Sequence, residues 1–257
     1  MTANHNTTVQ QQFDPQAKAY LHSAIHAQGP DLLRARAIVE QADPARTWRL
    51  LDLGCGAGHL SFALAPLCAE VTAIDPSPGM LHTVTEAATR QGLNNITTVQ
   101  AQAEHLPLAD AGFDIVATRY SAHHWQDLPQ ALAEMRRVLR PGGLVLVIDI
   151  EGHEHPLVDT HLQAMELLRD RSHVRDHCPS EWSHLLTAAG FGEVQHQSWP
   201  STLEFSAWVA RMRTPDERVA MIRTLQHEAP LEVQQALSIQ ADGSFTVCTG
   251  LWWGRAV

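Results

Sequence analysis

Three glycines at alternate positions follow a short apolar run in the first quarter of the chain. Gly54, Gly56 and Gly58 come directly after Leu50–Leu53, and a helical pattern starts at Leu60. Glycine lets a chain turn sharply and brings backbone N–H groups close to a ligand, at the positive end of the next helix. The pattern therefore predicts a loop that holds a nucleotide-type cofactor.

Two acidic residues flank this loop at positions that suit the rest of such a cofactor. Asp52 lies two residues before the first glycine, and Asp75 ends the next apolar run, 17 residues after Gly58. A carboxylate at the end of the second strand is the natural acceptor for two ribose hydroxyls. His59 stands where a nicotinamide-binding G-x-G-x-x-G loop carries its third glycine. The loop therefore disfavours a nicotinamide-dependent oxidoreductase, which is kept as an alternative hypothesis.

Two adjacent histidines follow the fourth apolar run. His123 and His124 lie in the segment 119–125, which we expect at the carboxyl edge of a parallel sheet, beside the crevice where such folds bind ligands. Imidazole can take a proton near pH 7, so these two residues are the candidate general bases. The alternative is that one of them packs against or caps the following helix.

The residues up to 150 alternate between short runs rich in Val, Ile and Leu and longer helical patterns. Turn signals such as Asn94-Asn95 and Pro141-Gly142-Gly143 separate the two. This alternation predicts a parallel, doubly wound α/β sheet. The predicted strands are 49–53, 70–75, 97–101, 113–119, 143–150, 193–199 and 244–253, and the predicted helices before residue 150 are 13–41, 60–69, 80–91 and 128–139.

After residue 150 the pattern becomes mainly helical. The helical stretch between the last two predicted strands, at about 203–238, is too long for a simple connection and suits a lid over a ligand crevice. A chain of 257 residues suits one α/β domain. We expect a single domain, 1–257, with a cofactor-binding core at 46–150 and helical lid elements on the substrate side at 1–45, 151–190 and 200–240.

The composition excludes several classes of protein. The formal net charge is −10 and Lys18 is the only lysine, so no cationic cluster suits a nucleic-acid backbone. No apolar run approaches the roughly 20 residues that span a bilayer, and the polar N-terminus lacks a signal-peptide pattern. Four cysteines, far apart, fit a reducing compartment. We expect a cytoplasmic protein without a membrane span. Its substrate should be a small molecule and not a nucleic acid, and the sequence allows a homodimer.

A histidine-rich stretch follows residue 150. It contains His153, His155, His161, His173 and His177, with Cys178 next to the last of them. The spacing fits no standard zinc pattern, and histidines on a polar turn usually face solvent. We therefore expect no metal ion.

Five segments stand in the order and spacing of class I S-adenosylmethionine (SAM) methyltransferases. They are Leu50–Gly58, Val71–Ser77, Ala101–Pro107, Phe113–Val116 and Leu139–Gly143. Within that superfamily the chain resembles the ubiquinone/menaquinone-methyltransferase-like (UbiE-type) group. The resemblance implies a Rossmann-like, seven-stranded sheet whose last strand is antiparallel. It also implies SAM as the cofactor and a methyl transfer to a small organic acceptor, with oxygen or carbon favoured over nitrogen.

The same resemblance implies which residues hold the amino-acid end of SAM. Gly54, Gly56 and Gly58 would line it, and Asp52 would lie near its ammonium group. Arg119 aligns with a position that contacts the methionine part. Cys55, within the glycine loop, faces the cofactor as a small space-filling residue and not as a nucleophile.

The rest of SAM is expected to contact residues further along the sheet edge. The resemblance implies that Asp75, followed by Pro76, accepts hydrogen bonds from the ribose hydroxyls and that Met80 packs near the adenine. Ala103 and Glu104 would bracket the adenine ring. Gln102 departs from the family, which commonly has an acid there, but a glutamine carbonyl can also accept a hydrogen bond from the adenine amino group.

The N-terminal region of the family folds over the cofactor, and Tyr20 matches that region. A core position for this aromatic residue is the equal alternative. For the whole protein, the alternative to a methyltransferase within the same resemblance is a SAM-binding protein that does not methylate, such as a regulator.

Overall fold

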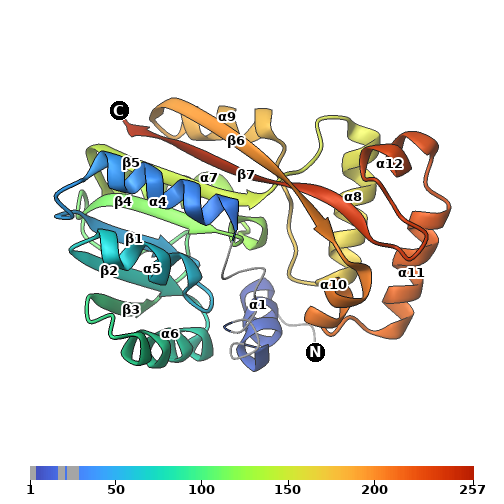
Figure 1. Ribbon diagram of the computed structural model, residues 1–257, viewed down its shortest axis with the longest axis horizontal. Helices are drawn as coiled ribbons and strands as arrows, with labels where there is room; N and C mark the ends of the chain where they lie inside the picture. Colours follow the sequence, from blue (N-terminus) through green and yellow to red (C-terminus); the bar gives the residue numbers. More distant parts are fainter. Residues whose placement is uncertain (1–3, 17–20, 22–28) are drawn as a thin grey trace.

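The computed structural model describes residues 4–16, 21 and 29–257. Within this part of the chain, seven strands form one sheet in the order β3-β2-β1-β4-β5-β7-β6 (Figure 1). The first five strands are parallel to one another, and β7 is antiparallel to both β5 and β6. The strands are β1 (Arg49–Leu53), β2 (Glu70–Asp75), β3 (Ile96–Gln100), β4 (Phe113–Arg119), β5 (Leu139–Ile150), β6 (Phe191–Leu203) and β7 (Phe245–Ala256). The predicted α/β sheet with an antiparallel last strand is confirmed.

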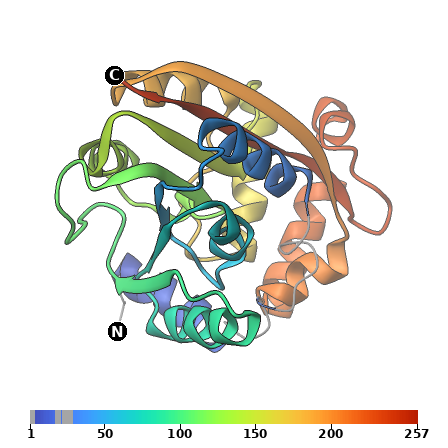
Figure 2. The ribbon, with the colours of Figure 1, turned by 60° about the vertical axis from the view of Figure 1, so that its left-hand side comes forward.

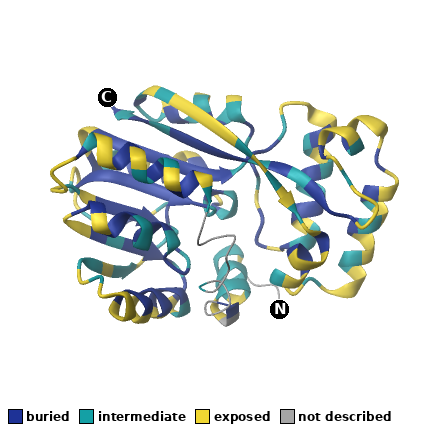
Figure 3. Ribbon diagram, in the orientation of Figure 1, coloured by how far each residue is buried: buried dark blue, intermediate teal, exposed yellow. Residues whose placement is uncertain are grey.

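Helices cover both faces of the central strands, which explains why these strands are apolar without alternation. All seven residues of β4 are buried, and Figure 3 shows the central strands as the buried core of the molecule. The apolar side chains of α4 and α5 pack on one face and those of α7 and α9 on the other. The helices around the sheet are α4 (Pro30–Ala42), α5 (His59–Leu64), α6 (Pro78–Gln91), α7 (Leu128–Val138) and α9 (Pro179–Ala188).

A second group of helices has its own apolar core at the end of the sheet. Trp208, Ile222 and Val233 pack there against Phe245, the first residue of β7. Figures 1 and 2 show this helical group beside the sheet, where the long strands β6 and β7 reach it. The group consists of α8 (Pro156–Arg169), α10 (Phe205–Arg211), α11 (Asp216–His227) and α12 (Leu231–Ala236).

The first helix, α1 (His5–Phe13), connects the sheet edge with the helical group. The Gln10 side chain donates to the carbonyl oxygen of Pro76 at 2.9 Å. The Gln12 side chain donates to the carbonyl oxygen of Met212, just after α10, also at 2.9 Å. Because these contacts reach both parts, α1 lies across the crevice between them.

The predicted helix at 13–41 is wrong as one continuous element. α1 ends at Phe13, where the prediction began, and α4 starts only at Pro30. The backbone of Gly29 is extended, with φ −161° and ψ 155°, as expected for a residue that precedes proline. Pro30 then takes the first helical position, where its missing N–H costs nothing. Tyr20 lies outside the described residues.

The last two strands are longer than predicted. β6 extends to Leu203 and β7 to Ala256, because the two pair with each other over most of their length. Pro200 stays within β6, opposite Cys248. It is tolerated because β6 is the edge strand of the sheet, where a missing N–H breaks no ladder. None of the helices in the described ranges is long and apolar enough to cross a membrane.

Candidate cofactor and acceptor site

One cavity brings the two candidate sites of the sequence together at the carboxyl ends of the parallel strands. Its walls include the glycine loop after β1, the end of β2, the segment 101–104 after β3, and the segment 119–125 after β4. Residues of α1, α8 and α10 complete it from the opposite side. The predicted cofactor residues that line it are Asp52, Gly54, Cys55, Gly56, Asp75, Pro76, Met80, Gln102, Ala103, Glu104 and Arg119, together with His123 and His124.

The glycine loop forms a tight turn that exposes backbone to the cavity. Gly54 and Gly56 have positive φ values of 68° and 50°. A methyl group on Gly56 would meet no heavy atom within 4 Å, so the backbone there faces open space. Gly58 does not line the cavity. It lies behind the loop, where an added Cβ would come within 2.7 Å of the Phe62 ring and 3.0 Å of Val84, so its role is close packing against α5 and α6.

Asp52 lines this cavity, is fully buried, and has one carboxylate oxygen without a hydrogen-bond partner among the described residues. Its Oδ2 accepts a hydrogen bond from the Ser61 hydroxyl at 2.6 Å. No hydrogen bond to its buried Oδ1 comes from any other described residue. Burial raises the pKa of Asp52 to about 6, against the lowering effect of Ser61. A buried acceptor of this kind is unfavourable without a donor, and the ammonium group of SAM fits the requirement.

Asp75 is held rigidly at the end of β2. Its Oδ2 accepts from the backbone N–H of Gly56 and its Oδ1 from that of Ser77, both at 2.9 Å. Burial raises the pKa of Asp75 to about 6, although these two N–H groups lower it. A carboxylate offers about four acceptor positions, so two are still available for the two ribose hydroxyls of SAM.

We expect Asp75→Ala to weaken binding of SAM and of S-adenosylhomocysteine (SAH) by roughly 1.5–3 kcal/mol, because it removes a charged acceptor from two hydroxyls. Isothermal titration calorimetry with SAH measures the effect. Asp110→Ala is the matched control, because the Asp110 side chain is 77% exposed and pairs with Arg137 on the surface. An unchanged dissociation constant for Asp75→Ala would show that Asp75 does not contact the ribose.

The segment 102–104, which is predicted to contact the adenine, is held by a short β-bridge and by the Glu104 side chain. Ala103 is buried, and Gln102 pairs with His105 across a short bridge. The Glu104 carboxylate accepts from the backbone N–H of Gln126 at 3.0 Å. Its side chain therefore ties the loop after β3 to the segment before α7.

Arg119 is anchored by an acid that sequence reasoning did not find. Its Nε donates to Asp31 Oδ2 at 2.5 Å, and both side chains are about 95% buried, with exposures of 5% and 4%. Its guanidinium lies 4.4 Å from the ring centroid of Tyr120. Asp31 belongs to the first turn of α4, 88 positions earlier in the chain, and no local pattern links the two residues.

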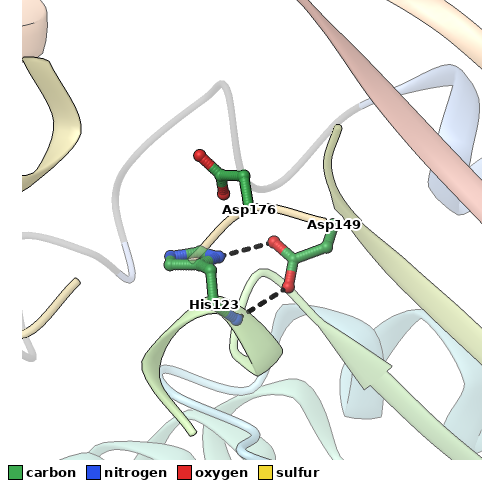
Figure 4. Close-up of side chains that lie close together, drawn as sticks. All are labelled: His123, Asp149 and Asp176. Atoms are coloured by element: carbon green, nitrogen blue, oxygen red, sulfur yellow. Dashed lines mark hydrogen bonds and ion pairs between the residues drawn. The ribbon is translucent and has the colours of Figure 1, made fainter. Parts of the chain in front are cut away.

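His123 forms a close pair with a second residue that the sequence did not indicate. Asp149, near the end of β5, accepts from His123 Nδ1 at 2.6 Å and from the His123 backbone N–H at 3.2 Å (Figure 4). Burial alone would lower the pKa of His123, but the charge and hydrogen bond of Asp149 outweigh it and raise that pKa to about 9. Because a carboxylate can only accept, Nδ1 carries the proton and Nε2 is the atom that gains or loses one.

His124 has a different environment. Its Nδ1 lies 2.9 Å from the carbonyl oxygen of Ser172, and since a carbonyl can only accept, Nδ1 must donate. Burial and the neighbouring charge of His123 lower its pKa to about 4. The Phe13 ring meets the imidazole edge-on at a centroid distance of 5.0 Å. These contacts favour the packing interpretation for His124 and leave His123 as the better candidate base.

The rest of the cavity, around His123, has both apolar and charged walls. Ile150, Leu203, Trp208 and Met212 are the apolar part, and the charged side chains are Glu166, Arg169, Asp170, Asp176 and Arg211. The Arg169 guanidinium is held by Glu166 at 3.1 Å and by the carbonyl oxygen of Trp208 at 3.1 Å. Apolar surface next to fixed charges suits an organic molecule that also carries polar groups.

Comparison with known proteins agrees with the fold and identifies the class of protein. A family model described as a methyltransferase domain matches residues 51–147. The uncharacterized protein YafE of Escherichia coli is 46% identical over 193 residues, which are 75% of this chain and 93% of that protein. The uncharacterized methyltransferase YcgJ of Bacillus subtilis is 32% identical over 88% of each chain. Its crystal structure superimposes with a TM-score of 0.82 over 88% of this chain and 97% of that one.

The names of several relatives state a reaction. The malonyl-[acyl-carrier protein] O-methyltransferase of Pseudescherichia vulneris is 31% identical over 91% of this chain and 89% of that protein. A ubiquinone/menaquinone biosynthesis C-methyltransferase UbiE, from Bartonella quintana, is 28% identical over 63% of this chain and 71% of that protein.

The chain therefore belongs to the class I SAM-dependent methyltransferases. The predicted resemblance to UbiE-type enzymes is confirmed, because such enzymes are among its homologues. SAM is the methyl donor of this family, and the nicotinamide hypothesis is thereby removed.

Proposed function

We propose that the protein moves the methyl group of SAM to a hydroxyl oxygen or an acidic carbon of a small organic acceptor. The observation that carries this proposal is the hydrogen-bonded pair of His123 and Asp149 in the wall of the cavity. An acceptor of either kind loses a proton on methylation, and an imidazole oriented by a carboxylate is suited to take it. The names of the relatives are compatible, since they include an O- and a C-methyltransferase.

The cofactor end is assigned to the residues that line the cavity from β1 to β3. Asp52 Oδ1 would accept from the ammonium group of SAM, and the exposed backbone at Gly56 would lie against its amino-acid part. Asp75 would hold the ribose, while Met80 and the segment 102–104 would enclose the adenine. When bound, SAM supplies an activated methyl group and a good leaving group, so the protein needs only to align the acceptor, exclude water and manage one proton.

The acceptor end is assigned to the helical elements. Within the expected lid segments 1–45, 151–190 and 200–240, we take α1, α8 and α10 as the lid of a single domain whose SAM-binding core is 46–150, because α4 and α9 pack on the faces of the sheet. In support, α1, α8 and α10 each contribute residues to the cavity wall opposite the sheet. The apolar side chains there, such as Trp208 and Leu203, would exclude water from the reacting atoms and bind the organic part of the acceptor.

The tautomer of His123 decides which ring nitrogen can take the proton. Nδ1–H donates a hydrogen bond to Asp149, so His123 takes the acceptor proton at Nε2. The O–H or C–H bond of the acceptor breaks, an Nε2–H bond forms, and the resulting imidazolium is stabilised by the Asp149 carboxylate.

We expect a small-molecule product that carries the label when the protein is incubated with SAM bearing a trideuteriated methyl group and a bacterial small-molecule extract. Mass spectrometry locates the labelled compounds, and fragmentation shows the atom that received the methyl group. His123→Gln in parallel identifies products that depend on the site. Label found only in protein or nucleic acid, or only on nitrogen, would contradict the proposal.

A further inference from the structure

Asp176 is a buried acid whose hydrogen-bonding capacity is unused. It lies in the segment 170–178 between α8 and α9 and is only 2% exposed. Neither carboxylate oxygen has a hydrogen-bond partner among the described residues, and the nearest ionisable nitrogen, His173 Nε2, is 4.0 Å away. Burial raises the pKa of the Asp176 carboxyl well above its ordinary value, while a positive charge on His123 lowers it, so Asp176 ionises most readily when His123 is protonated.

The segment 170–178 is attached directly to His123. The backbone N–H groups of Val174 and Arg175 donate to the carbonyl oxygen of His123 at 2.8 and 3.2 Å. Polar atoms of His123, Asp149 and Asp176 lie within 4.8 Å of one another (Figure 4). The imidazole therefore has a carboxylate bonded to Nδ1 and a second carboxylate close by that makes no bond.

Of the three histidines in this cluster, His123 is the one that carries a positive charge. Burial and the charge of His123 hold the pKa of His124 near 4 and that of His173 near 2, so both are neutral. Glu166 is already paired with Arg169. Asp170 accepts from the backbone and hydroxyl of Ser172. Asp149, Asp176 and Glu166 all raise the pKa of His123.

We propose that Asp176 is a positioning residue that places a second carboxylate beside His123, so that the imidazole can take and keep the proton that the acceptor loses. The inference rests on the proposed function. Methylation of a neutral hydroxyl breaks the O–H bond, forms an O–CH₃ bond, and leaves the C–S electron pair on sulfur. The positive charge of the sulfonium thus disappears and an equal charge appears on His123. Asp149 and Asp176 together provide the counter-charge at that place.

A divalent cation is the other occupant that this cluster could suggest, since imidazole and carboxylates are metal ligands. The hydrogen bonds argue against it. The side of the imidazole that faces Asp149 carries the Nδ1 proton, so a metal there would have to displace a 2.6 Å hydrogen bond. Asp149 Oδ1 also accepts from the backbone N–H of Ile150, and Oδ2 from that of His123. A proton satisfies this geometry without any rearrangement.

The test is a pH titration of the His123 imidazole by NMR, with ¹³C- and ¹⁵N-labelled histidine and SAH bound. His123→Gln assigns the signal. We expect a pKa well above the ordinary 6.5 in the wild type, and a fall of about one unit or more in Asp176→Asn. Asp110→Asn, which changes an exposed and distant acid, should leave the titration unchanged. The pH profile of methyl transfer should move in the same direction as the NMR titration.

Three results would overturn the inference. The first is a wild-type His123 that titrates at or below 6.5. This measurement needs no variant, so it tests the inference even if Asp176→Asn fails to fold. An unchanged His123 titration in a folded Asp176→Asn is the second. The third is stoichiometric binding of Mn²⁺, Mg²⁺ or Zn²⁺ in calorimetry that is lost in Asp176→Asn. If Asp176→Asn lowers the His123 pKa but His123→Gln leaves turnover intact, the proposed function fails while the placement of Asp176 stands.

Discussion

His123→Gln is expected to lower the rate of methyl transfer about 10²-fold or more and to leave SAH affinity nearly unchanged. Glutamine can still donate to Asp149 from its side-chain amide, so the loop keeps its shape, but it cannot take a proton. The cofactor end of the cavity is formed by other residues, between β1 and β3. Turnover is measured as SAH formed with a saturating acceptor, and affinity by calorimetry.

The pH dependence separates a base from a residue that only packs. With the pKa of His123 raised to about 9, the neutral, proton-accepting form increases about tenfold per pH unit as the pH rises toward 9, and then levels off. The wild-type rate should follow this rise, and His123→Gln should lose it. His82→Gln is the control, because His82 is exposed on α6 and pairs with Glu86. A parallel slope in wild type and His123→Gln would assign the titration to another group.

The sheet was predictable because its signals are local. A parallel strand that is buried on both faces is a continuous apolar run, and β1, β2 and β4 have the predicted bounds. The ends of β6 and β7 were not predictable, because the pairing partner and not the local pattern extends them. The break before α4 did have a signal, since a glycine followed by a proline at 29–30 disfavours a continuous helix.

The candidate site divides in the same way. The residues proposed for the cofactor could be singled out because glycines and acids at strand ends have a fixed geometric role, and most of them line one cavity. In the acceptor half only the histidines were noticed, and their partners were missed. Asp149 lies 26 positions from His123 and Asp31 lies 88 from Arg119. The first pair is created by the pairing of β4 with β5, and the second by the packing of α4 on the sheet. The packing of His124 likewise depends on Ser172 and on α1, which only the folded chain brings close.

Gly54→Ala is expected to abolish measurable SAH binding, a loss of about 3 kcal/mol or more. Two effects add up. An alanine at the positive φ of 68° is strained by about 1–3 kcal/mol. Its Cβ would also stand 1.9 Å from the Ser121 hydroxyl oxygen and 2.6 Å from Ser121 Cβ, so either the loop or the segment after β4 must move. Both segments line the cavity, and calorimetry with SAH together with thermal unfolding measures the result.

The two effects can be separated because the chain offers a matched glycine. Gly92, after α6, has a similar φ of 70°, but an added Cβ there meets nothing within 4 Å. Gly92→Ala should therefore cost only the backbone strain, about 1–3 kcal/mol of stability, with normal SAH affinity. Ser121→Gly in the Gly54→Ala background removes both clashing atoms, and should restore binding toward that of Ser121→Gly alone, which itself loses the Trp125 hydrogen bond at 3.1 Å. If the double variant binds no better than Gly54→Ala, the backbone conformation of the loop, and not its contact with the segment after β4, governs the cofactor site.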